Sequence, residues 1–68
     1  MRTQVIIEPV YGGWILFIDV LDEEGNILPT SRFFEFNRLI EALNAASAMR
    51  LHVDNIDDLP LHQYGMAS

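Results

Sequence analysis

The side chains best suited to metal chemistry gather near the C-terminal end of the chain. His52 and His62 flank Asp54, Asp57 and Asp58. Imidazole and carboxylate groups are common metal ligands, but this spacing matches no established zinc or calcium pattern, and the residues straddle a turn-forming sequence. We therefore interpret them as solvated polar residues and expect no metal site.

The remaining polar residues do not indicate covalent catalysis or phosphate binding. The chain contains no cysteine, and Ser31, Ser47 and Ser68 have no neighbours that would activate a nucleophile. Gly12-Gly13 is followed by neither the lysine nor the helix of a phosphate-binding loop. The acidic stretch at residues 22–26 lacks the alternating ligands and the final glutamate of an EF-hand. We expect a non-enzymatic protein without a cofactor.

Charge and length narrow the choice of partners. The 68 residues include ten acids and only four basic residues, all arginine, which gives a net charge of -6. Phosphate binding needs clustered basic side chains, so direct nucleic-acid binding is not expected. No apolar run approaches the roughly 20 residues that span a bilayer, and no signal segment is visible. We expect a cytoplasmic protein without membrane contact, whose acidity can steer it towards a basic partner.

The first half of the chain has the composition of a small antiparallel sheet. Gly12-Gly13 suits a tight hairpin turn, and Gly25 suits the left-handed position of a second, bulged turn. Pro29 removes a hydrogen-bond donor, so the third strand belongs at an edge or carries a bulge. Three strands are predicted, at residues 4–10, 14–21 and 27–36.

The second half changes to the period of a helix. Apolar residues recur at spacings of three and four after Asn37, a plausible N-cap, and predict a helix over residues 38–50. Residues 51–53 are a candidate for a short fourth strand. The fold class is therefore α+β: a three-stranded antiparallel sheet (β-β-β-α) with one helix packed on one face. We expect one domain over residues 1–61 and a mobile C-terminal tail over residues 62–68.

The predicted turns also fix which side chains share a face. With Gly12-Gly13 as the loop, Ile7 lies opposite Ile18, and a three-residue second loop places Trp14 opposite Phe34. One face then carries Trp14, Leu16, Ile18 and Val20, the natural seat for the helix. The other face mixes apolar and polar residues: Ile6, Ile15, Phe17, Leu21, Ile27 and Phe33 with Gln4, Glu8, Asp19, Ser31 and Glu35.

One helix cannot cover both faces of a sheet, so this mixed face is the candidate contact surface. Apolar patches with polar rims commonly mark protein interfaces. The residues predicted to bind a partner are Glu8, Ile15, Phe17, Asp19, Phe33 and Glu35. Two alternatives remain open: a homodimer formed through this face, and cover by the C-terminal segment that holds Leu51, Val53, Ile56, Leu59 and Leu61.

The order of these elements resembles the β-β-β-α domains of HicB-type antitoxins. Tyr11-Gly12-Gly13-Trp14 and the alanine-rich stretch at residues 39–49 carry the resemblance, which spans about residues 4–50. The family's Pro-Asp-Leu-Pro-Gly segment is replaced by the acidic turn at residues 22–26, and no DNA-binding extension follows the helix. The resemblance therefore implies the fold more than an antitoxin role.

The chain also looks like the small acidic inhibitors that phages and mobile elements encode, such as anti-CRISPR proteins. That likeness rests on size and charge, and it implies an acidic surface that docks on a basic nucleic-acid-binding protein. We predict a small acidic protein-interaction module, with an inhibitor of such a protein as the sharper hypothesis. An antitoxin-like or structural homodimer is the alternative, ahead of a small enzyme or ligand carrier.

Overall fold

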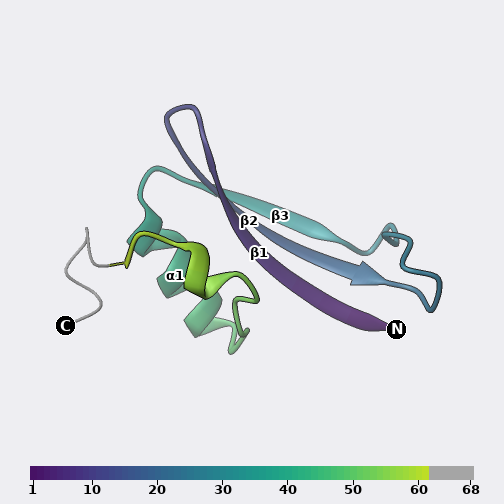
Figure 1. The fold of residues 1–68 in the computed structure, drawn as a ribbon. Helices are drawn as coiled ribbons and strands as arrows, with labels where there is room; N and C mark the ends of the chain where they lie inside the picture. The colour runs from purple at the N-terminus through teal and green to yellow at the C-terminus, as the bar shows by residue number, and fades with distance from the viewer. Residues whose placement is uncertain (62–68) are drawn as a thin grey trace.

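Three antiparallel strands are followed by one helix in the computed structural model, which describes residues 1–61 (Figure 1). The predicted mobile tail at residues 62–68 lies outside the described residues. The strands are β1 (Arg2–Val10), β2 (Gly13–Leu21) and β3 (Arg32–Phe36), in the spatial order β1-β2-β3. The helix α1 (Leu39–Ala48) and a 3-10 turn η1 (Ile56–Asp58) follow within the described residues. The predicted α+β fold is confirmed.

The first hairpin turns one residue earlier than predicted. Tyr11 and Gly12 form the loop, and Val10 pairs with Gly13. Only Gly12 of this loop has a positive φ, at +85°, so glycine is needed at the second loop position. The predicted pairing of Ile7 with Ile18 is therefore wrong, because Ile7 lies opposite Leu16. The shift of two residues keeps every side chain on its predicted face.

The third strand starts later than predicted because residues 28–31 form a turn of their own. The predicted register holds beside the acidic turn, where Leu21 bridges Ile27 and the Leu28 amide donates to the Val20 carbonyl. The Ser31 amide then donates to the Leu28 carbonyl, and β3 pairs two residues out of the predicted register. Trp14 accordingly lies opposite Phe36 and not Phe34. A disturbance near Pro29 was expected from its missing donor.

The N-cap and the first residue of helix α1 each lie one residue later than predicted, and the helix ends at Ala48, two residues before the predicted end. Arg38 is the N-cap residue, and its backbone N–H donates to the Glu41 carboxylate at 3.1 Å. At the other end Arg50 has a left-handed φ of 58°, while the Leu51 amide donates to the Ala46 carbonyl. This arrangement is a Schellman motif with arginine at the position that glycine usually takes. It turns the chain back towards β1.

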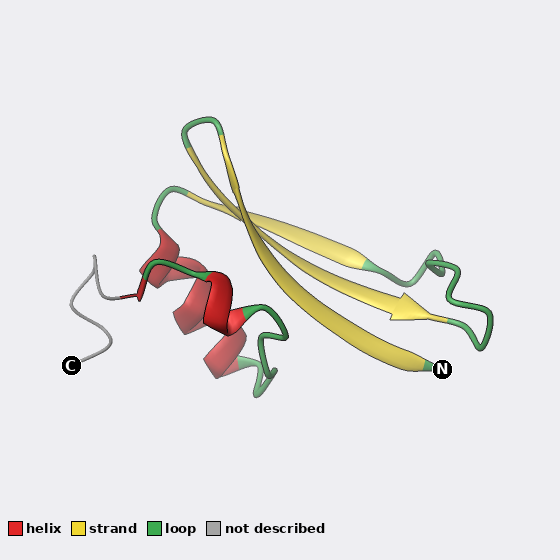
Figure 2. Cartoon of the chain, in the orientation of Figure 1, coloured by secondary structure: helices red, strands yellow, loops and turns green. Residues whose placement is uncertain are grey.

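The hydrophobic core lies between one face of the sheet and the helical layer. Helix α1 covers β2 and β3, and residues 51–61 return beside β1 (Figures 1 and 2). The fully buried centre is formed by Ile7, Leu16, Leu39, Ala42 and Ala46, all at 0% exposure. A ten-residue helix is only about 15 Å long, against about 30 Å for a nine-residue strand, so the sheet projects beyond its cover.

Residues 51–53 do not form the predicted fourth strand. The two residues that follow them bind the outer edge of β1 instead, and we call Asp54 and Asn55 the edge clamp. The Val5 amide donates to Asp54 Oδ2 at 2.8 Å, and the Asp54 amide donates to the Val5 carbonyl at 2.7 Å. The Asn55 side chain accepts from the Ile7 amide at 3.0 Å and donates to the Ile7 carbonyl at 2.8 Å. A short loop thus takes the place of a strand along this edge.

Candidate functional site

The face of the sheet opposite the helix is organised in rows across the three strands, and we call it the open face. Ile6 lies opposite Phe17, which lies opposite Phe33, so one row is wholly apolar. In the next row Ile15 stands between Glu8 and Glu35. A third row pairs Gln4 with Asp19 on the other side of the apolar one. The open face therefore has an apolar centre between two acidic rows.

Side chains of the apolar row remain accessible at the surface. The rings of Phe17 and Phe33 are 6.4 Å apart between centroids and tilted by 41°, a geometry favourable for aromatic pairs. Phe33 is 59% exposed, although a phenylalanine gains stability from burial. Beside these rings a shallow depression of about 330 Å³ is lined by Gln4, Ile6, Glu8, Phe17 and Asp19.

All six residues predicted from the sequence lie on this face. The register brings together Glu8, Ile15, Phe17, Asp19, Phe33 and Glu35. The predicted set omitted Ile6 and Gln4, which complete the apolar and polar rows. The two-residue alternation had already placed both on this face, so they could have been included in the binding set. Ser31, expected on the same face, instead turns its hydroxyl to the Val20 amide at 2.9 Å.

The C-terminal segment does not cover the open face over its described part. Val53 and Leu59 are buried in the core on the helix side, and Leu51, Ile56 and Leu61 pack against that core. The alternative in which these residues fold over the patch is therefore wrong. Their apolar side chains pack against the β1 side chains that α1 does not reach.

Carboxylates dominate the electrostatics of the open face. Glu8 and Glu35 are exposed on either side of Ile15, and Asp19 is half-buried beside Phe17. Arg2, opposite Leu21 at the far end of the sheet, is the one basic side chain that the register places on this face within residues 1–61. The surface around the apolar row therefore attracts cationic groups.

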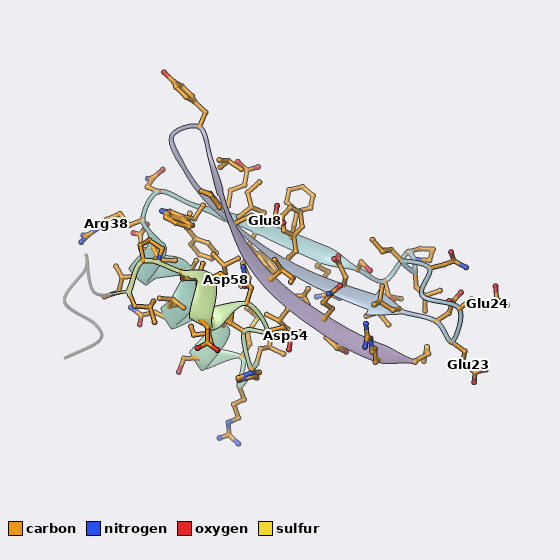
Figure 3. The ribbon with its side chains drawn as sticks, viewed as in Figure 1. Glu8, Glu23, Glu24, Arg38, Asp54 and Asp58 are labelled. Atoms are coloured by element: carbon orange, nitrogen blue, oxygen red, sulfur yellow. The ribbon has the colours of Figure 1, made fainter. Side chains whose placement is uncertain are left out.

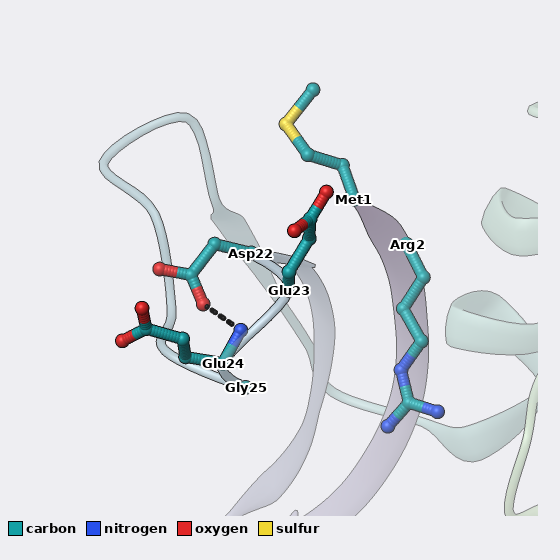
Figure 4. Close-up of a pocket in the computed structure, with 6 residues that line it drawn as sticks. All are labelled: Met1, Arg2, Asp22, Glu23, Glu24 and Gly25. Carbon is teal, nitrogen blue, oxygen red and sulfur yellow. Dashed lines mark hydrogen bonds between the residues drawn. The ribbon is translucent and has the colours of Figure 1, made fainter.

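A second depression lies at the acidic turn, between residues 22–25 and the start of β1 (Figure 4). The Asp22 carboxylate binds the turn itself, because Oδ1 accepts from the amides of Asn26 and Glu24, both at 2.9 Å. The hydrogen bond from the Asn26 backbone, and then that from Glu24, hold the pKa of Asp22 below its ordinary value of 3.8. Glu23 and Glu24 project from this turn at the end of the molecule far from α1 (Figure 3).

The His and Asp residues near the C-terminal end, which the sequence analysis weighed as metal ligands, are not gathered around one point in the described part of the chain. The Asp54 carboxylate is bound to the β1 edge and lies beside that strand (Figure 3), and His62 lies outside the described residues. Across residues 1–61, no three or more His, Asp or Glu side chains are grouped as a metal ion would require. None of the helices found there has the length and apolar character to cross a membrane.

The chain was compared with models of protein families, with curated proteins and with solved structures, and none of them matches it. The resemblance to HicB-type antitoxins and to small phage inhibitors therefore stays a prediction.

Proposed function

We propose that this protein is a non-enzymatic interaction module that binds a basic protein through the open face. The observation that carries the proposal is the apolar row of Ile6, Phe17 and Phe33, which stays at the surface between acidic rows. The described C-terminal residues are used on the other side of the sheet, so they do not compete for this row.

The arrangement suits a partner surface that combines apolar and cationic side chains. An aliphatic or aromatic side chain of the partner fills the depression beside Phe17. Arginine or lysine side chains pair with Glu8 and Glu35, and a guanidinium stacks on the exposed ring of Phe33. Proteins that bind nucleic acid carry such cationic surfaces, so the bound module blocks access to the phosphate backbone.

The test uses the tagged protein as bait in a cytosolic extract, followed by titration of the purified partner. We compare the wild type with Ile6→Ser and Phe33→Ser, which remove two members of the apolar row from different strands. Truncation of a central aromatic at an interface costs about 2 kcal/mol or more, which is roughly thirtyfold in affinity. The matched control is Ile27→Ser, at a side chain that is 63% exposed and bridges Leu21 at the far end of the sheet, outside the three rows.

Two further measurements distinguish an inhibitor of a nucleic-acid-binding protein from a module that docks on other proteins. The affinity should fall steeply as salt is raised, because Glu8, Asp19 and Glu35 carry the charge complementarity. Nucleic acid should compete with the module for the partner. Binding that survives both serine variants contradicts the site, and binding that is insensitive to salt contradicts the basic partner.

A further inference from the structure

The two outer strands of the sheet differ in whether the described part of the chain hydrogen-bonds their outer edges. On β1 the edge clamp occupies the outward N–H and C=O groups of Val5 and Ile7. Pro9, the next residue with this orientation, has no N–H to offer. Proteins protect strand edges in this way against pairing with another chain. The β1 edge is closed except near Thr3.

The edge of β3 has no such protection within residues 1–61. The Val20 amide donates towards β3, so the even-numbered residues of β2 and their partners in β3 form the ladder. The N–H and C=O groups of Phe33 and Glu35 therefore point away from β2. No hydrogen bond from the described part of the chain reaches them. Arg32–Phe36 also contains no proline, lysine or bulge that would discourage pairing.

Exposed aromatic side chains flank this edge on both faces of the sheet. Phe33 lies on the open face at 59% exposure. Phe34 lies opposite Leu16 on the helix side, yet it is 39% exposed and is absent from the side chains packed on the core. A strand added at this edge would contact the flank of both rings while it paired the free backbone groups.

We propose that β3 pairs with β3 of a second copy, antiparallel and centred on Phe34, to form a continuous six-stranded sheet. In this register Phe33 of each copy lies opposite Glu35 of the other, and the two exchange four backbone hydrogen bonds. The two Phe34 side chains meet on the helix side. The occupant is a second copy because β3 is complementary to itself in this register.

Charge favours this self-pairing at β3 in an otherwise acidic chain. The strand carries one arginine and one glutamate, so its own charge is zero. Centring on Phe34 places Arg32 opposite Phe36 and keeps the two Glu35 carboxylates from facing each other directly. The overall charge of -6 on each copy still opposes association. Dimer formation should therefore strengthen as salt screens that repulsion.

This inference does not rest on the proposed function, because it uses a strand edge and not the open face. The two respond to salt in opposite directions, since binding of a basic partner weakens while the dimer becomes tighter. Ile6→Ser separates them further. That variant should lose the basic partner but keep the dimer, because Ile6 lies on β1, two strands from the proposed contact.

The first experiment measures the mass of the full chain by light scattering behind a sizing column, from micromolar to millimolar concentration. We expect a particle of twice the 7.8 kDa chain mass. Glu35→Pro removes an outward N–H that the monomer does not use, and should raise the dimer dissociation constant about tenfold or more. Thr3→Pro is the matched control, at an outward N–H of the opposite edge, and should remain dimeric.

A monomer at every concentration overturns the proposal, and would leave the edge to residues 62–68 or to a foreign strand. A Glu35→Pro protein that dimerises as tightly as the wild type also overturns it. Circular dichroism of each variant shows whether the protein still folds with the proline in place.

The second experiment tests the register by a route that does not need proline. The chain has no cysteine, so a single substitution gives a clean cross-linking probe. Facing Phe34 positions form a non-hydrogen-bonded pair with Cα atoms about 4.5 Å apart, within the range of a disulfide. Phe34→Cys should form a covalent dimer under mild oxidation much faster than Ile27→Cys, an exposed position before β3 that this register does not bring close to its counterpart in the other copy. Equal rates for the two variants would overturn the proposed pairing.

Discussion

Replacing Asn55 with alanine tests whether the edge clamp holds the C-terminal segment on the sheet. Asn55→Ala removes the acceptor of the Ile7 amide and the donor to the Ile7 carbonyl, bonds of 3.0 and 2.8 Å. Both bonds are partly buried, and 48 positions separate the two residues along the chain. The variant therefore breaks a long-range connection without removing any apolar side chain.

The size of the effect follows from how well water replaces the lost side chain. A hydrogen bond whose groups become solvated is worth about 0.5–1.5 kcal/mol, whereas a buried group left unpaired costs about 1–3 kcal/mol. With two partly buried bonds we expect a loss of about 2–3 kcal/mol. A domain of this length has a total stability of about 3–10 kcal/mol, so the loss is a large fraction. The melting temperature should fall by roughly 8–24 °C.

Urea unfolding followed by fluorescence gives the comparison directly. Trp14 is the single tryptophan and packs against the core, so its emission reports loss of the fold. Asn44→Ala is the matched control, because Asn44 is exposed on α1 and forms none of the side-chain hydrogen bonds found in residues 1–61. If the two variants unfold within about 0.5 kcal/mol of each other, the clamp contributes nothing measurable and our reasoning fails.

Three further substitutions test single features of the fold, each by urea unfolding. Gly13→Ala should destabilise the fold strongly, because the added Cβ would overlap a backbone carbonyl oxygen of β3. Unchanged stability would mean that β2 and β3 can move apart at this point without a cost in free energy. Arg50→Gly should raise stability by about 1 kcal/mol, since glycine adopts the left-handed φ of 58° without strain; a loss would show that the arginine side chain contributes more. Asp22→Ala should lower stability at neutral pH. The folded pKa of Asp22 lies below 3.8, mainly through the Asn26 amide. The difference in stability between the wild type and the variant should therefore disappear as the pH falls from 3.8 through that folded pKa.

The alternation of residue types was enough to predict the faces of the sheet. Phe17, Asp19 and Phe33 share the open face in the structure as they do in the sequence pattern. The register itself was wrong by two residues in the first hairpin and in β3. Gly12-Gly13 offers more than one tight turn, and the Ser31 hydroxyl replaces a backbone partner in the ladder. An even shift preserves the face, which is why the candidate site survived both errors.

The sequence by itself determined the strands, the helix and the acidic, apolar character of one sheet face, because these follow from periods of two and 3.6 residues and from local turn chemistry. Only the tertiary structure decided which edge and which face remain free. Asp54 and Asn55 close β1 from far along the chain, and Val53 and Leu59 enter the core on the helix side. These contacts depend on where the chain returns after α1. A local pattern carries no information about that path, because the same apolar spacing would suit either face of the sheet.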